Sequence, residues 1–164
     1  MSTNLIVNET DQGYRIALLK NKDLVEFHFE EESARFKVGD IYLGIVKKVV
    51  PGLNAAFIDI GYDKDAFLHY LDLGPQVNSL KKFTKLALTR TNTSAKLSNF
   101  RPEPDIDKSG KISQVLSRNQ QILVQVVKEP ISTKGPRLSC EISLAGRYLV
   151  LVPFSNSISV SKKI

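Results

Sequence analysis

The clearest pattern in the chain lies in residues 39–70, where apolar and polar residues alternate in short runs separated by Gly and Pro. Alternation with period two in β-branched and aromatic runs is typical of half-buried strands. Pro51-Gly52 marks one turn, and residues 61–65 mark a second. The segment is therefore predicted to be a β-meander with strands over residues 41–49, 55–60 and 66–69.

Alternation also decides which side chains of this meander share a face. One face holds aliphatic side chains, and the other holds Phe57, Phe67 and His69. Lys47 and Lys48 lie nearby on the first strand. A lone Phe in a strand more often belongs to the core, but here the opposite face already supplies the aliphatic core. Because exposed rings stack on bases and lysines hold phosphates, we predict a surface for single-stranded nucleic acid.

Further strands are predicted on both sides of the meander. The first roughly thirty residues show another three-strand pattern, too small to be stable alone, which must pack on something. Downstream, residues 122–127 are predicted to be a buried strand and residues 137–142 a closing strand. With the meander these make five strands, the number that an OB-fold barrel requires.

The last predicted hairpin carries three cations, Lys128, Lys134 and Arg137. Two interpretations stay open for them, phosphate contact and ordinary surface charge.

Residues 74–113 differ from the rest in composition. Basic residues alternate there with Ser, Thr and Asn, and Gly74-Pro75 interrupts the chain at the start. A loop of this length in a small barrel is either functional or disordered. Its basic side chains could reach nucleic-acid phosphates, but we predict a mobile, solvated insertion, with a helical turn at residues 112–116.

Composition narrows the class of protein. The chain has 164 residues, a formal net charge of +6 and a pI near 9.4, which favour a polyanionic partner. The single cysteine, Cys140, excludes an internal disulfide and a multi-cysteine zinc site. No apolar run reaches membrane-spanning length, and the first residues lack the features of a secretory signal. We therefore expect a cytoplasmic protein that does not enter a membrane.

Three carboxylates, Asp59, Asp63 and Asp65, are close enough in sequence to suggest a metal site for hydrolysis. Asp63 and Asp65 fall in a predicted turn, however, where Asp is favoured for local hydrogen bonding. No His or Glu is placed to complete such a site, and His28 and His69 fit sheet positions better than catalytic ones. We predict no catalytic and no metal-binding residue in this chain.

Two sets of residues resemble known families. The first set consists of Gly44, Val46 and residues 57–58, 60–61 and 66–69. It resembles the S1-type RNA-binding domain, a small OB-fold barrel, although it has Ala66 where that family usually has Gly. The second resembles the N-terminal region of the ribonuclease E/G family, and it consists of LSCEISLAGRYLVLVP at 138–153 with residues 5–8, 42–44 and 53–57.

The second resemblance implies a specific architecture. The chain is expected to be mainly β, with a five-stranded, antiparallel, S1-like OB-fold barrel inserted in the start of an RNase H-like subdomain. The barrel would span residues 37–143, with its insertion at about 74–113. Residues 1–36 and 144–164 would be the two flanks of a partial RNase H-like β-meander, and a strand at 148–152 would pair with the N-terminal strands.

The resemblance also implies a function. These enzymes are magnesium-dependent endoribonucleases that cut single-stranded RNA in RNA processing and decay. Their catalytic carboxylates, magnesium and structural zinc lie outside the region that this chain resembles, so we expect an RNA-binding front end without catalytic residues. The expected partners are single-stranded RNA and the rest of the nuclease chain.

The family's RNA contacts carry over onto Phe57, Phe67, Lys128 and Lys134. With the residues predicted from the pattern itself, the candidate RNA-binding set is Phe57, Phe67, His69, Lys47, Lys48, Lys128, Lys134 and Arg137. The alternative function is an oligomerisation or protein-interaction element that uses the exposed Phe patch, with a second copy of the chain as one partner.

Overall fold

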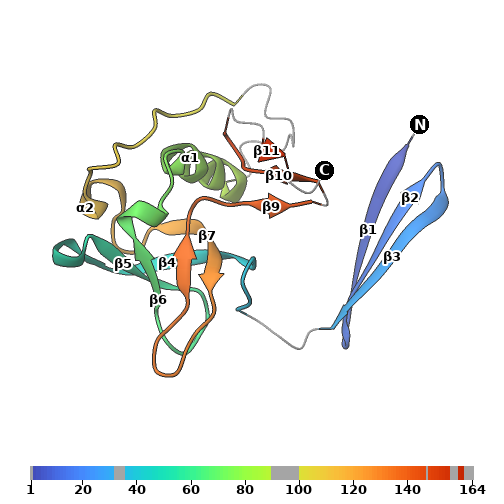
Figure 1. Ribbon diagram of the computed structural model, residues 1–164, viewed down its shortest axis with the longest axis horizontal. Helices are drawn as coiled ribbons and strands as arrows, with labels where there is room; N and C mark the ends of the chain where they lie inside the picture. The colour runs from blue at the N-terminus through green and yellow to red at the C-terminus, as the bar shows by residue number, and fades with distance from the viewer. Residues whose placement is uncertain (1, 32–35, 90–99, 147, 156–158, 161–164) are drawn as a thin grey trace. The chain divides into compact units, whose positions relative to one another are not determined.

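The computed structural model describes residues 2–31, 36–89, 100–146, 148–155 and 159–160. It divides into two compact units, unit 1 at Met1–Arg35 and unit 2 at Phe36–Ile164 (Figure 1). Unit 1 holds one three-stranded sheet, whereas unit 2 holds a closed barrel and a second three-stranded sheet.

Unit 1 is the predicted antiparallel meander, with strand order β1-β2-β3. Its strands are β1 Thr3–Thr10, β2 Gly13–Lys20 and β3 Asp23–Glu31. Both faces carry apolar side chains, because Leu5 pairs with Leu18 on one face and Ile6 pairs with Ala17 on the other. No apolar side chain within residues 2–31 is buried, so this part of the sheet has no core of its own.

Unit 2 contains a closed five-stranded barrel, which confirms the prediction of a mainly β protein and is consistent with an OB-fold. Val46, Ile58 and Leu68 are fully buried inside it. The strand order around the ring is β4-β5-β6-β8-β7. The strands are β4 Ile41–Val50, β5 Ala55–Asp59, β6 Ala66–His69, β7 Gln121–Lys128 and β8 Arg137–Ser139.

The barrel differs from the antiparallel prediction in one pairing, because β6 and β8 run parallel. Strand direction alternates between antiparallel neighbours, so a closed ring with an odd number of strands must contain a parallel pair. This pair is short and places Phe67 opposite Arg137. The Asp72 carbonyl oxygen reinforces it by accepting hydrogen bonds from Cys140 N at 2.8 Å and Ser139 Oγ at 3.0 Å. The Asp72 carboxylate accepts a further bond from Arg137 Nε at 3.0 Å.

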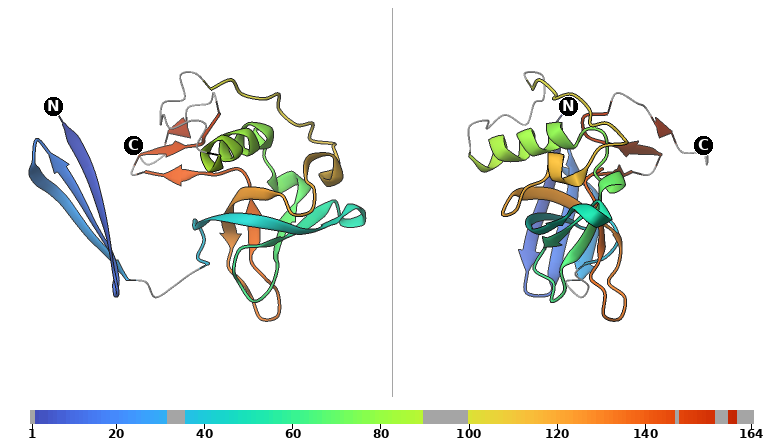
Figure 2. Two further views of the ribbon diagram at one scale, coloured as in Figure 1. Left: turned by 180° about the vertical axis from the view of Figure 1, so that it is seen from behind. Right: turned by 90° about the vertical axis from the view of Figure 1, so that its left-hand side faces the viewer.

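The prediction of a mobile, solvated insertion is wrong for the described part of residues 74–113. Val77, Leu80 and Thr84 are buried at helical spacing on one helix, a periodicity that the polar residues between them conceal. This helix lies at one end of the barrel (Figure 2). Residues 90–99 lie outside the described residues. The elements between β6 and β7 are the 3₁₀ helix η2 Tyr70–Asp72, the helix α1 Val77–Leu88 and the predicted helical turn, α2 Ile112–Val115.

Hydrogen bonds hold residues 101–103 against α1. Ser79 Oγ accepts from the Glu103 backbone N at 2.8 Å. Lys82 Nζ donates to the Arg101 carbonyl at 2.9 Å and pairs with the Glu103 carboxylate at 2.6 Å. Tyr70 also donates from its hydroxyl to the Asp107 carbonyl. The described part of the insertion is therefore a structured layer.

The predicted strand at residues 148–152 forms in unit 2, and its predicted pairing with the N-terminal meander stays a prediction. Within unit 2, β10 Leu149–Leu151 is the central strand of a sheet, between β9 Leu144–Ala145 and β11 Ser159–Val160. Gly146 N donates to the Leu149 carbonyl at 2.8 Å, so the chain turns back directly after β9. Closing this short loop costs less conformational entropy than pairing with a strand far away in sequence.

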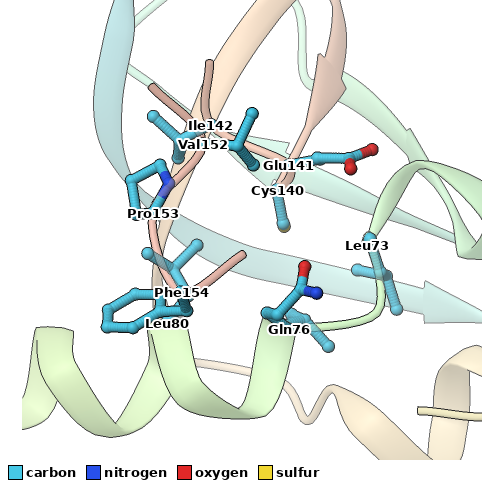
Figure 3. A pocket seen from close by; sticks show the side chains of 11 residues that line it. Leu73, Gln76, Leu80, Cys140, Glu141, Ile142, Val152, Pro153 and Phe154 are labelled. Atoms are coloured by element: carbon cyan, nitrogen blue, oxygen red, sulfur yellow. The ribbon is translucent and has the colours of Figure 1, made fainter. Parts of the chain in front are cut away.

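The segment after β10 packs against α1. Figure 3 shows Phe154 beside Leu80 on the helix, with Val152 and Pro153 lining the same crevice. The Phe154 ring lies 5.8 Å from Phe83 and 5.1 Å from Phe100, measured between ring centroids. The crevice has about 10 Å³ of free space, too little for a ligand larger than a water molecule. Its role is therefore packing.

The packing of α1 predicts different effects for two leucines on the same helix. Leu80→Ala should lower the free energy of unfolding by about 2–5 kcal/mol, because it removes a buried side chain and leaves a cavity. Leu88→Ala should change it by less than about 0.5 kcal/mol, since Leu88 is 47% exposed. Urea denaturation followed by circular dichroism measures both. Equal effects would contradict the packed position of α1.

Candidate nucleic-acid interface

Five predicted site residues form one continuous row across the barrel, here called the cross-strand row. Lys48 on β4 pairs with Phe57 on β5, and Phe57 pairs with Phe67 on β6. Phe67 pairs with Arg137 on β8, which in turn pairs with Lys128 on β7. Because directly paired residues share a face of a sheet, all five side chains lie on the same side. Two aromatic rings occupy the middle, and cations occupy both ends.

The outward position of the two rings follows from the alternation that the sequence predicted. Their strand neighbours Ile58, Ala66 and Leu68 are fully buried, whereas Phe57 and Phe67 are partly exposed. The two ring centroids lie 5.9 Å apart with an interplanar angle of 68°, an edge-to-face arrangement. Each ring therefore keeps part of its surface open to solvent.

Two β-bulges bring the outer lysines onto the cross-strand row. On β4 the register shifts between Val46 and Lys48, and on β7 it shifts between Val126 and Lys128. Val46 and Val126 point into the core, so strict alternation would bury the residue two positions further on. One extra residue in each strand reverses this and turns Lys48 and Lys128 outward.

The cross-strand row lies in an open groove with a volume of about 840 Å³, here called the basic groove. Two loops complete it, the β5–β6 turn and the β7–β8 hairpin. They contribute Lys64, Asp65, Thr133, Lys134 and Gly135 to its lining. Lys64 is the cation that the sequence analysis missed, although its place in the turn between the two aromatic strands was a usable signal.

The basic groove gathers six of the eight predicted RNA-binding residues and leaves two outside its lining. His69 accepts a hydrogen bond at Nδ1 from Leu71 N at 3.1 Å, so it caps η2, and its ring lies 6.4 Å from that of Phe67. Lys47 pairs with Asp65 at 3.0 Å and with Asp59 at 3.4 Å. Both residues border the groove without lining it.

The charge of the basic groove is strongly positive. Arg137 is held by the Asp72 carboxylate, with Nη2 2.8 Å from Oδ2. Four other lining cations have no acidic partner among the described residues, and these are Lys48, Lys64, Lys128 and Lys134. They are the side chains most available to an anionic ligand.

Asp59 and Asp65 are engaged by Lys47, as the ion pairs above show. The hydrogen bonds that the Lys47 ammonium donates to Asp65 and Asp59 raise its pKa. The Gly61 N–H, with a contribution from Lys47, lowers the pKa of Asp59. The described residues contain no cluster of three or more His, Cys, Asp or Glu side chains suited to a metal ion.

Cys140 offers no reactive thiol either. It is buried beside the barrel, and desolvation raises its pKa, so the thiolate is disfavoured. The described helices are too short or too polar to cross a bilayer.

The two loops that complete the basic groove touch at Gly135. A Cβ added there would overlap the backbone carbonyl oxygen of Asp65. Only glycine lets the β7–β8 hairpin approach the β5–β6 turn this closely.

This close approach predicts that Gly135→Ala lowers the free energy of unfolding by about 1–3 kcal/mol, because one loop must move away from the other. Gly52→Ala is a matched control, since a Cβ there meets no atom within 4 Å. Thermal unfolding followed by circular dichroism compares the two variants. Similar melting temperatures would contradict the contact between the loops.

Comparison with known proteins agrees with the resemblance found in the sequence. No protein-family model matches the chain. Ribonuclease G of Escherichia coli is 37% identical over 164 residues, which cover 100% of this chain and 30% of that protein. Ribonuclease G of Haemophilus influenzae is 36% identical over 168 residues, covering 99% of this chain and 29% of that protein. Ribonuclease E of a Nostoc species is 35% identical over 165 residues, covering 100% and 20%.

The chain thus spans less than a third of the length of these curated relatives. Identity to both ribonucleases extends along essentially all of it. On this basis the chain belongs to the ribonuclease E/G family, whose N-terminal region it represents.

Proposed function

We propose that this chain is the single-stranded RNA-binding module of a ribonuclease E/G-type endoribonuclease that acts in RNA processing and decay. The observation that carries the proposal is the cross-strand row, with two partly exposed rings between cations at both ends. Single-strand binding proteins combine these two features, since rings stack bases and a positive groove follows the phosphates. The names of the relatives support RNA as the polyanion.

The geometry supports a simple division of roles. Phe57 and Phe67 each stack one base, which contributes on the order of 1–3 kcal/mol per base. The four unpaired lysines of the basic groove contact phosphates on either side of the stacked bases. Arg137 stays bound to Asp72 and closes the row next to Phe67.

Little base preference follows from this arrangement. Thr133 is the one neutral hydrogen-bonding side chain among the groove residues that the structure describes. Every base has a face that stacks on a ring, so stacking tolerates most sequences. The module would therefore hold the RNA strand without choosing the sequence.

Catalysis is proposed to reside in the part of the longer enzyme that this chain does not include. Asp59 and Asp65 both pair with the Lys47 ammonium, so a metal ion would compete with that ammonium for their oxygens. The chain's own contribution would be to bind the strand and to orient it for cleavage elsewhere.

The stacking role predicts a loss of RNA affinity on removal of either ring. Phe57→Ala and Phe67→Ala should each weaken binding of a fluorescent oligouridine by about 5- to 100-fold in fluorescence anisotropy. Phe27→Ala is the matched control, because Phe27 is an exposed phenylalanine in unit 1 and its loss should leave affinity unchanged. Circular dichroism verifies that each variant is folded.

The outcome also separates RNA binding from the alternative of a protein-interaction element. If the folded wild-type chain does not bind oligouridine, or if the two variants bind as well as the wild type, the proposed platform is wrong. The alternative function, a protein-interaction element that uses the two rings, would then remain. Sedimentation of the wild type and of the double variant would show such an apolar contact as a difference in oligomeric state.

Salt dependence gives an independent prediction from the charges. With four phosphate contacts, the logarithm of the association constant should fall with the logarithm of salt concentration with a slope of about −2.8 for a single strand. Titrations at several salt concentrations measure this slope. A slope near zero would contradict phosphate binding by the lysines of the basic groove.

A further inference from the structure

The basic groove contains one carboxylate among its described lining residues, Asp65. A free carboxylate at this place would repel phosphate and compete with it for the neighbouring lysines. Asp65 is not free, however, because its Oδ1 lies 3.0 Å from Lys47 Nζ. Lys47 itself does not line the groove. The cation next to the groove is therefore directed at the protein's own acid.

We infer that Lys47 is a positioning residue that neutralises Asp65 and keeps it from competing with RNA phosphates, and that it is not itself a phosphate ligand. The inference rests on the proposed function, since it concerns how the same groove accepts RNA. It assigns different roles to two adjacent lysines on one strand, Lys47 and Lys48.

The β4 bulge explains how adjacent lysines come to differ. The register passes directly from Val46 to Lys48, so Lys47 is the extra residue of the bulge, and Lys48 takes the place opposite Phe57. Lys48 is thereby on the cross-strand row and has no acidic partner among the described residues. Lys47 lies beside the row, and its ammonium reaches two carboxylates.

Asp59 provides the second contact that holds Lys47 in this position. Its Oδ2 lies 3.4 Å from Lys47 Nζ, and its Oδ1 accepts a hydrogen bond from Gly61 N at 3.0 Å. The ammonium is therefore placed between a carboxylate anchored by the start of the β5–β6 turn and a carboxylate at its end. This arrangement favours the charged form of Lys47, which agrees with its raised pKa.

The charges around Asp65 give the expected effect of losing Lys47 on RNA affinity. With Lys47 present, its positive charge offsets part of the negative charge of Asp65 and Asp59, and the four unpaired lysines face the ligand. Without it, the Asp65 carboxylate is exposed next to Lys64 and within the groove. A phosphate at contact distance from that carboxylate then meets a repulsion worth about a fivefold loss of affinity at low salt.

The test is a double-mutant cycle on the whole chain, with fluorescent oligouridine as the probe. Lys47→Ala should weaken binding about fivefold at low salt in the wild-type background. In the Asp65→Asn background, where the groove lining has lost its carboxylate and Asp59 lies outside that lining, the same substitution should change affinity by less than about twofold. Lys48→Ala is the matched control, and it should cause the same loss in both backgrounds.

The outcomes separate failure of the inference from failure of the proposed function. If Lys47→Ala weakens binding equally in both backgrounds, Lys47 contacts RNA directly and the inference is overturned. If Lys47→Ala has no effect in either background, Asp65 needs no neutralisation and the inference also fails. Failure of the wild-type chain to bind oligouridine would instead overturn the proposed function. Melting curves of all variants exclude loss of folding as the cause of weaker binding. The cycle excludes a purely structural role of Lys47, because such a role would not depend on the charge at position 65.

Discussion

The closure of the barrel between β6 and β8 is the constraint on which the rest of unit 2 depends. A ring of five strands requires one parallel pair, and this pair here has a single register contact between Phe67 and Arg137. Asp72 compensates for the short pairing through its carbonyl and its carboxylate. Hydrogen bonds between a guanidinium and a carboxylate are among the stronger ones in proteins. The same contact joins the two halves of the cross-strand row, so closing the barrel also assembles the candidate site.

The candidate site also depends on the two β-bulges at the ends of the cross-strand row. A regular strand would turn Lys48 and Lys128 toward a core that is filled by side chains such as Val46 and Val126. Burying an unpaired ammonium there would be very costly. The bulges avoid this cost by adding one residue to each strand. They also create the position of Lys47, whose surroundings then differ completely from those of Lys48.

Around the barrel, the connection between β6 and β7 acts as a structural layer. α1 buries Val77 and Leu80 at the barrel end, and the Phe83, Phe100 and Phe154 rings join the helix to two other segments. Unit 1 contrasts with this, because its sheet exposes apolar side chains on both faces. A sheet of that kind is stable in water only when other protein covers it.

The sequence by itself determined the local features of this protein. Period-two alternation identified Phe57 and Phe67 as outward-facing, and the turn residues separated the strands of the barrel and of the meander. Motifs in several separate segments identified the family, and the alignment to its members covers the whole chain. These features depend on neighbours in sequence, where spacing and residue type carry the information.

The tertiary structure alone decided the features that depend on contacts between distant segments. The parallel closure at Arg137, the two bulges and the pairing of Lys47 with Asp65 each require a register that no single strand encodes. Polar residues on its other face concealed the helix α1, whose apolar face is buried by packing against the barrel. The pairing of β10 with β9 and β11 is likewise a choice of partners that the residues of one strand do not encode.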